Sequence, residues 1–167
     1  MAICNPADLK HLSAAGSRLM GLDLGSKTIG LALSDTRRTI ATPLETIRRT
    51  RFTADAARLR TLIEAHGVGA LAIGLPVAMD GSEGPRCQSV RQFAASLLET
   101  VDIPIAFWDE RLSTAAVTRG MIAADLTRKR RAALVDRAAA AYILQGLLDY
   151  LGHLPPIAEA PAAFTES

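Results

Sequence analysis

Three short apolar runs near the start of the chain predict a β-meander. Residues 19–24 and 28–34 are mostly apolar, and a Gly-Ser-Lys tripeptide typical of a hairpin turn separates them. Residues 39–47 form a third run that extends the hairpin. Residues 1–17 lack such patterning, so we expect them to form a flexible N-terminal extension.

Helical and strand patterns alternate after the meander. Apolar positions recur at helical spacing over residues 52–66, and the apolar run 70–75 indicates a buried strand. A Ser-Glu-Gly-Pro start signal then precedes a helix whose apolar positions run from Val90 to Leu98. The remaining expected elements are a strand over 103–108, a helix over 113–123 and a long helix over 132–151.

This order of elements predicts an α/β fold with a mixed five-stranded sheet. The three-stranded antiparallel meander precedes the β-α alternation, and helices cover both faces. We expect one domain over residues 18–151 and a flexible tail over 152–167, because 167 residues leave little beyond a single domain. Binding sites in such sheets lie outside the carboxyl ends of the strands.

The composition is that of an ordinary globular domain, with 49% hydrophobic and 22% charged residues. Aromatic residues make up only 4%, which argues against a surface that stacks nucleic-acid bases on several rings. The only cysteines, Cys4 and Cys87, lack the spacing of a zinc site and fit a reducing cytoplasm. No apolar run approaches the ~18 residues of a membrane span, so we expect a cytoplasmic protein without a membrane partner.

Basic residues are concentrated locally, although the formal net charge is only +2. Residues 1–60 hold ten Lys and Arg against five Asp and Glu. Within this segment, one group has the charge needed to follow a nucleic-acid backbone: Arg48, Arg49, Arg51, Arg58 and Arg60. The run at 128–131, Arg-Lys-Arg-Arg, is expected in a connection before the last helix. A solvated surface is the plain alternative for either group.

Acidic residues stand at the carboxyl ends of two predicted strands. Asp23 ends the first strand and precedes a glycine, which permits close approach of a ligand. Asp109 and Glu110 follow the strand 103–108 directly. The structural alternatives are a turn aspartate for Asp23 and a pair of helix-start acids for the other two.

Asp136 is the most informative acid, because it shares a helical face with apolar positions further along the final helix. A carboxylate on a buried face is costly unless it is paired or binds a metal ion. An arginine such as Arg111 or Arg137 is the alternative partner. The apolar positions on its face are Ala140, Ile143, Leu144, Leu147 and Leu151.

Three carboxylates from separate elements are expected to converge at one edge of the sheet. Their mutual repulsion calls for a divalent cation, and carboxylate oxygens suit Mg²⁺ or Mn²⁺. Such a site activates water for phosphodiester hydrolysis. The three histidines lie in the extension, at a helix end and in the tail, which gives zinc chemistry little support. The residues expected to bind substrate phosphates are Lys27, Ser82, Arg111, Arg128, Lys129, Arg130 and Arg131.

Four segments resemble the YqgF/RuvX family, and they occur in unbroken order over residues 18–151. They are GLDLGSKTIG at 21–30, GLP at 74–76 with MDGSEGP at 79–85, WDERLST at 108–114, and Asp136 before an alanine-rich helix. Members of this family are described as candidate pre-16S rRNA nucleases and as proteins resembling Holliday junction resolvases. The resemblance implies an RNase H-like fold related to that of RuvC.

The resemblance also implies roles for particular residues. By motif, Asp23, Glu110 and Asp136 match the catalytic acids and metal ligands, and Asp109 is the alternative to Glu110 as second ligand. Thr28 stands where many members carry an arginine, so one phosphate contact is expected to be missing.

The sequence therefore favours a metal-dependent nuclease that matures the 5′ end of pre-16S rRNA, acting as a monomer or a homodimer. The alternatives are a DNA nuclease similar to Holliday junction resolvases and a non-catalytic RNA-binding factor in ribosome assembly. The Asp-Leu-Gly-Ser-Lys-Thr segment also resembles the first phosphate loop of actin-like ATPases. Those folds need two such domains, and 167 residues supply one.

Overall fold

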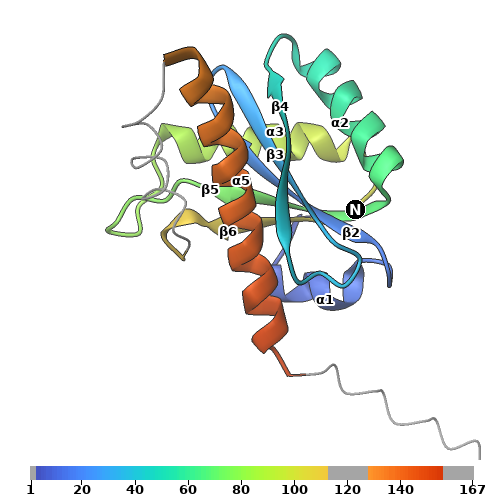
Figure 1. Cartoon of the computed structure of the whole chain (residues 1–167). Coiled ribbons are helices and arrows are strands. Elements are labelled where there is room, and N and C mark those ends of the chain that lie inside the picture. The colour runs from blue at the N-terminus through green and yellow to red at the C-terminus, as the bar shows by residue number, and fades with distance from the viewer. Residues whose placement is uncertain (1–2, 113–127, 156–167) are drawn as a thin grey trace, which may run out of the picture.

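A computed structural model describes residues 3–112 and 128–155, and for 128–136 it describes the helical backbone alone. A mixed sheet forms the centre of this part of the molecule (Figure 1). The strands are β1 (Ile3–Cys4), β2 (Arg18–Leu24), β3 (Thr28–Ser34), β4 (Ala41–Arg48), β5 (Val68–Leu75) and β6 (Ile105–Asp109). The helices are η1 (Pro6–Asp8), α1 (Leu9–Leu12), α2 (Phe52–His66), α3 (Pro85–Leu98), η2 (Glu110–Leu112) and α5 (Arg128–His153).

The strand pairing confirms the predicted meander and the β-α alternation that follows it. β2 pairs antiparallel with β3, and β3 pairs antiparallel with β4. β5 pairs parallel with both β2 and β6, as crossover helices require. The strand order among the described residues is β1-β6-β5-β2-β3-β4.

The predicted number of strands was wrong, because this sheet has six strands and the sequence predicted five. The added strand is β1, which pairs parallel with β6 through Ile3↔Ile105 and Cys4↔Ala106. Two residues are too few to produce the period-two alternation by which a strand is recognised in a sequence. The partner of β1 also lies about a hundred residues away along the chain.

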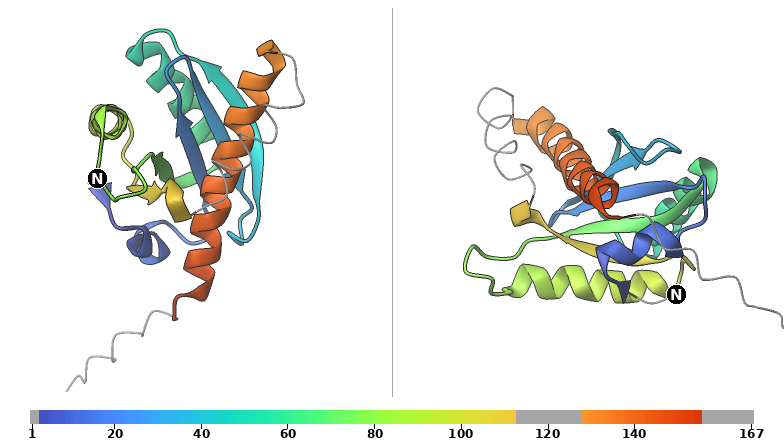
Figure 2. Two further views of the ribbon diagram at one scale, coloured as in Figure 1. Left: turned by 90° about the vertical axis from the view of Figure 1, so that its left-hand side faces the viewer. Right: turned by 90° about the horizontal axis from the view of Figure 1, so that it is seen from below.

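Helices cover both faces of the sheet, as predicted. Figure 2 shows α5 on one face and α3 on the other. The side chains of β2 alternate between two cores: Met20 and Leu22 pack with residues of α2 and α3, whereas Leu19 packs with α5. Small residues dominate the strands on the α5 face, and they are Ala32, Ala70, Ala72 and Ala106.

Gly21 lets α5 approach β2 more closely than any side chain would allow. A Cβ atom at this position would lie 2.8 Å from the Leu144 Cβ and 2.9 Å from the Ala140 carbonyl oxygen. These two atoms belong to the helix backbone or stand directly on it, so they cannot swing aside. The position of α5 over the sheet is therefore fixed partly by the absence of a side chain on β2.

α2 spans the predicted residues 52–66. Its end is set by Gly67, which adopts the left-handed conformation (φ 63°) and donates its N–H to the Ile63 carbonyl. Its start is supported by Asp55, a buried carboxylate that accepts a hydrogen bond from the Thr50 N–H. A glycine directly after a periodic segment is a common helix stop signal, whereas nothing in the sequence singles out Asp55.

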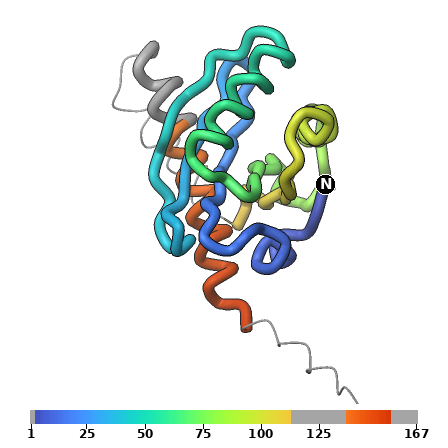
Figure 3. Tube along the Cα trace, turned by 90° about the vertical axis from the view of Figure 1, so that its right-hand side faces the viewer, coloured from blue at the N-terminus to red at the C-terminus, as the bar shows by residue number. Residues whose placement is uncertain are grey.

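The segment expected to be a flexible extension, 1–17, contributes a strand and a core side chain to the domain. Leu9 of α1 is fully buried in the core beneath α5. The Lys10 Nζ donates to the carbonyls of Leu151, Leu154 and Pro155, at 3.4, 2.9 and 3.3 Å. A cation beside the final carbonyls of a helix is favourable. Figure 3 shows α1 beside the C-terminal half of α5.

α5 is longer than the predicted helix 132–151, because it begins at Arg128. The basic run 128–131 was expected in a connection and is instead helical, in keeping with the high helix propensity of Arg and Lys. The predicted helix over 113–123 lies outside the described residues. Within the described ranges, no helix has both the length and the apolar character needed to cross a membrane.

Candidate active site

Asp23 lies at the carboxyl end of β2, near the middle of the sheet. It is only 3% exposed. It follows Gly21 by two residues, so strand alternation places it on the α5 face. The turn after it is closed by a hydrogen bond from the Gly25 N–H to the Thr28 carbonyl, 2.8 Å long. A carboxylate is thus held at the end of a central strand, beneath the helix.

Glu110 comes to the same edge of the sheet from β6. Its Oε1 lies 2.8 Å from the place that a Cβ on Gly74 would occupy, so its carboxylate lies over the backbone of β5. β5 stands between β6 and β2, and Gly74 follows Ile73, the register partner of Leu22. Gly74 and Asp23 are the residues that follow this register pair, so they lie side by side on the adjacent strands β5 and β2. Both acids occupy the α5 face at the carboxyl edge.

The structure leaves the third predicted acid untested. Asp136 lies on α5, one turn before Ala140, whose carbonyl is the neighbour of Gly21. Its side chain is outside the described residues, so its place in a trio of carboxylates stays a prediction. Among the residues whose side chains are described, no three acids, histidines or cysteines form a group that could hold a metal ion. The donor chemistry of Asp23 and Glu110 is that of a Mg²⁺ or Mn²⁺ site.

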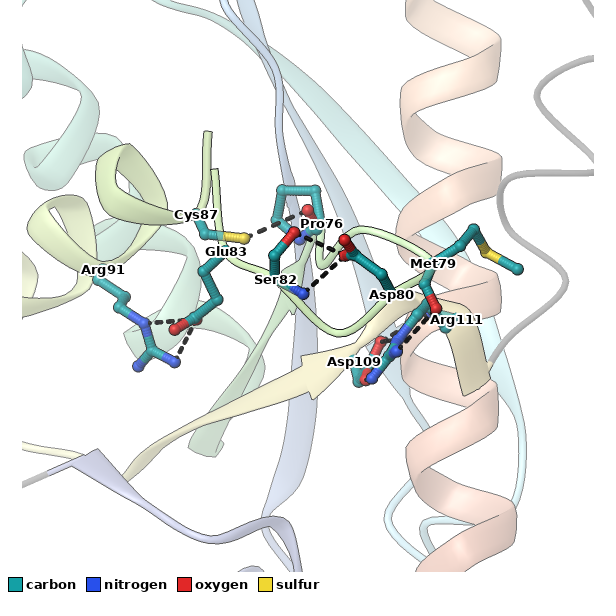
Figure 4. A network of polar contacts seen from close by, with 9 residues as sticks. All are labelled: Pro76, Met79, Asp80, Ser82, Glu83, Cys87, Arg91, Asp109 and Arg111. Carbon is teal, nitrogen blue, oxygen red and sulfur yellow. Dashed lines mark hydrogen bonds and ion pairs between the residues drawn. The ribbon is translucent and has the colours of Figure 1, made fainter. Parts of the chain in front are cut away.

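Asp109 is engaged by Arg111, next to Glu110 (Figure 4). The Arg111 Nη2 donates to the Asp109 Oδ2 at 2.7 Å, and the Nε lies 3.0 Å from the same oxygen. These side-chain hydrogen bonds hold the pKa of Asp109 below its ordinary value, and the Arg111 backbone N–H adds to the effect, although partial burial opposes it. The same contact raises the pKa of Arg111.

The Asp109–Arg111 pair changes the interpretation of both residues. The guanidinium that the sequence offered as a phosphate ligand is occupied by a carboxylate, and its Nη1 lies 3.4 Å from the Met79 carbonyl. It therefore ties the loop 76–84 to the end of β6. The Asp109 oxygens accept hydrogen bonds from Arg111. Of the two neighbouring acids, Asp109 and Glu110, it is Glu110 that extends over Gly74.

The loop 76–84 carries Ser82, another residue expected to bind phosphate. Its hydroxyl donates to the Asp80 Oδ1 at 2.6 Å, and its N–H donates to the same oxygen at 2.9 Å. Both contacts lower the pKa of Asp80. At the far end of the loop, Glu83 forms an ion pair with Arg91 of α3. The loop is thus fastened at several points (Figure 4).

The remaining phosphate-binding candidates lie at two places. Lys27 is exposed in the β2–β3 turn, and its carbonyl accepts the Arg49 N–H at 2.8 Å. The side chains of Arg128, Lys129, Arg130 and Arg131, at the start of α5, lie outside the described residues. Sequence reasoning missed the role of Gly74. The only signal was a glycine late in a buried strand, which indicates close approach without identifying the partner.

The sheet order, the helix lying across it and the carboxylates at its edge define an α/β protein of the RNase H-like class. The solved structure of Thermus thermophilus RuvC in complex with a Holliday junction has this fold. It superposes with a TM-score of 0.51 at 14% identity, covering 81% of this chain and 96% of that one. A model of the RuvX family, described as Holliday junction resolvase, matches residues 17–150. The chain belongs to the RuvX family.

Close relatives support this membership over nearly their whole length. A protein of Paramagnetospirillum magneticum is 65% identical over 149 residues, which is 89% of this chain and 96% of the relative. A protein of Methylocella silvestris is 58% identical over 149 residues, which is 89% of this chain and 92% of that one. Both are named as candidate pre-16S rRNA nucleases.

Proposed function

We propose that this protein is a divalent-metal-dependent nuclease that hydrolyses a phosphodiester bond of precursor 16S rRNA in the cytoplasm. The observation that carries the proposal is the placement of Asp23 and Glu110 on the same face, at the same edge of the sheet. The names of the close relatives favour the ribosomal RNA precursor as substrate.

Asp23 and Glu110, together with Asp136, would hold Mg²⁺ or Mn²⁺. The bound metal lowers the pKa of a water molecule and neutralises charge on the reacting phosphate. The chain provides the positioning. Asp23 is fixed by its strand and shielded by α5, which limits water around the carboxylate. The exposed Lys27 in the adjacent turn attracts the substrate phosphates.

The Asp109–Arg111 pair has a positioning role in this proposal. Arg111 contacts Asp109 through its side chain and also through its backbone N–H, at 2.9 Å. Glu110 lies between the two residues, so its backbone is held from both sides. A carboxylate presented on a fixed backbone loses less conformational freedom when it binds a metal ion.

Branched DNA is the second candidate substrate, because the family model carries the description of a Holliday junction resolvase. The test is cleavage of a labelled 16S rRNA precursor and of a four-way DNA junction, side by side, in Mg²⁺, Mn²⁺ or chelator. We expect metal-dependent cutting of the RNA. Cutting of the junction alone would identify branched DNA as the substrate in place of the RNA. Binding of the RNA without any cutting would favour a non-catalytic assembly factor.

Two variants test the residues. Glu110→Gln and Asp23→Asn each remove one charged metal ligand, and we expect each to reduce cleavage by about 10³-fold or more while RNA binding in chelator persists. Glu99→Gln makes the same chemical change at an exposed position at the end of α3 and should cut like the wild type. If Glu110→Gln cuts at the wild-type rate, Glu110 has no place in the site.

A further inference from the structure

A groove lies between α3 and the start of α2, on the face of the sheet opposite α5. It consists of two adjoining pockets of about 300 and 570 Å³ that share Arg49, Ser89 and Phe93 in their linings. The first begins at the β2–β3 turn with Leu24, Gly25 and Ser26. The second continues between the helices and is lined by polar side chains from α3, which are Gln88, Gln92 and Ser96.

The charges in this groove are positive. Arg49 and Arg86 both line the first pocket, and none of the described residues lining either pocket is acidic. Arg49 is held in place, because its Nη1 donates to the Gly25 carbonyl at 2.7 Å and its guanidinium lies over the Phe93 ring. Its charge is not neutralised by either contact. In the described part of the chain, no carboxylate forms an ion pair with Arg49 or Arg86.

The start of α3 adds to this positive potential. Gly84 occupies the N-cap without a capping side chain, and Pro85 follows it. The first backbone N–H groups of a helix carry partial positive charge and favour anions. Pro85 and Arg86 line the pocket, so the helix start and two guanidinium groups face the same space.

Two aromatic rings line the groove. Phe52 of α2 and Phe93 of α3 are in edge-to-face contact, with ring centroids 5.5 Å apart. Bases are free to stack on a protein ring where they are unpaired, whereas a duplex keeps its bases paired in its interior. Phe52 remains 37% exposed at the groove as a surface on which an unpaired base can stack, which favours a single strand as the occupant.

The groove also connects to the candidate active site. Leu24 and Gly25, which line its first pocket, directly follow Asp23 in the chain. The exposed Lys27 belongs to the same turn. A nucleic-acid strand that leaves Asp23 and passes over this turn therefore reaches Arg49 and Arg86 next.

We infer that the groove between α2 and α3 binds the phosphodiester backbone of a single-stranded flank of the substrate, with Arg49 and Arg86 contacting its phosphates. This assignment rests on the proposed function for the identity of the strand. It gives the protein a preference for substrates in which a single-stranded segment adjoins the bond that is cut.

The experiment measures binding in chelator, so its result does not depend on catalysis. The probes are a fluorescent 16S precursor fragment with a single-stranded flank of about eight nucleotides, within the ~4–16 nucleotides that one small domain covers, and the same fragment without the flank. Arg86→Gln is the main variant, because Arg86 is exposed and forms no ion pair with any of the described residues. Arg37→Gln removes the same charge from an exposed position in the β3–β4 turn, outside the groove.

We expect the flank to strengthen binding by the wild type and Arg86→Gln to lose that advantage. One lost phosphate contact on a single strand lowers the slope of log K against log salt by about 0.7, which corresponds to about fivefold in affinity at 0.1 M relative to 1 M salt. Arg37→Gln should retain both the affinity and the slope. Arg49→Gln, checked for an unchanged melting curve, should behave as Arg86→Gln does.

Two results would overturn the assignment: equal affinities for Arg86→Gln and wild type on the flanked RNA, or an equal loss with Arg37→Gln. The second result would mean that only overall charge matters. Failure of the proposed function has a different signature, because a protein that cuts no substrate would still show the flank-dependent loss of binding.

Discussion

Gly21→Ala is the sharpest test of how α5 is seated on the sheet. The added methyl carbon would lie 2.8 Å from the Leu144 Cβ and 2.9 Å from the Ala140 oxygen, whereas ordinary contacts begin at 3.4 Å. Neither neighbouring atom can rotate away. The helix must therefore move off β2 by about 0.6 Å, or the strand must yield by as much.

The magnitude follows from this overlap. Inserting a methyl group into a packed core costs about 1–3 kcal/mol of unfolding free energy. For a chain of this length, each kcal/mol lowers Tm by roughly 2–4 °C. α5 also carries Asp136, so moving the helix displaces one predicted metal ligand from the other two. Since a misplacement of ~1 Å can cost about 10²-fold in rate, a shift of about half that size should cost on the order of tenfold.

The assay is thermal unfolding of the variant, followed by precursor cleavage below its Tm. Gly152→Ala is the matched control, because a Cβ there meets no atom within 4 Å and the position lies in the last turn of the same helix. It should be neutral or stabilising by up to about 1 kcal/mol. A Gly21→Ala protein as stable as the wild type would refute the close seating of α5 on β2.

Two further predictions concern the N-terminal segment and the Asp109–Arg111 pair. Leu9→Ala should lower the unfolding free energy by about 2–5 kcal/mol in a denaturant titration, because Leu9 is fully buried. Leu12→Ala, at a 42% exposed position, is the control and should change the unfolding free energy little. Equal effects of the two substitutions would place α1 outside the domain. The carboxyl group of Asp109 should titrate by NMR below the ordinary value of ~3.9 and return to it in Arg111→Gln. Because the pKa of Asp109 is lowered in the folded state, the stabilisation by the ion pair is present above the ordinary pKa and is lost as the pH falls through the lowered pKa. A titration midpoint of Asp109 at the ordinary value would contradict the ion pair.

Local patterns in the sequence were sufficient for most of the fold. The apolar runs separated by Gly-Ser-Lys became β2 and β3, and the periodic segment ended by Gly67 became α2, because in each case the signal and the structure lie within about fifteen residues. β1 could not be found in this way. Its two residues become a strand only because β6, a hundred positions later, offers a free edge.

In the candidate site too, some residues could be identified from local sequence patterns and others could not. Asp23 and Glu110 could be singled out because each follows an apolar run at the edge where ligands bind. The ion pair of Asp109 with Arg111 depends on the conformation of the backbone after β6, which no residue pattern encodes. The arginine group near residue 49 was visible as charge alone. The role we propose for Arg49 depends on the pocket that it lines together with Arg86, which comes from the start of α3.

The pairing of β1 with β6 determines when the molecule can be completed. β1 has no partner until residues 105–106 have been made, and Lys10 reaches its carbonyl acceptors only when residues 151–155 exist. Contacts across so long a stretch of chain form slowly, because a large loop must close first. β1 and α1 therefore dock late during synthesis, after β6 and the end of α5 have been made. Since β1 borders the strand that leads to Glu110, that strand gains its edge partner only at this late stage.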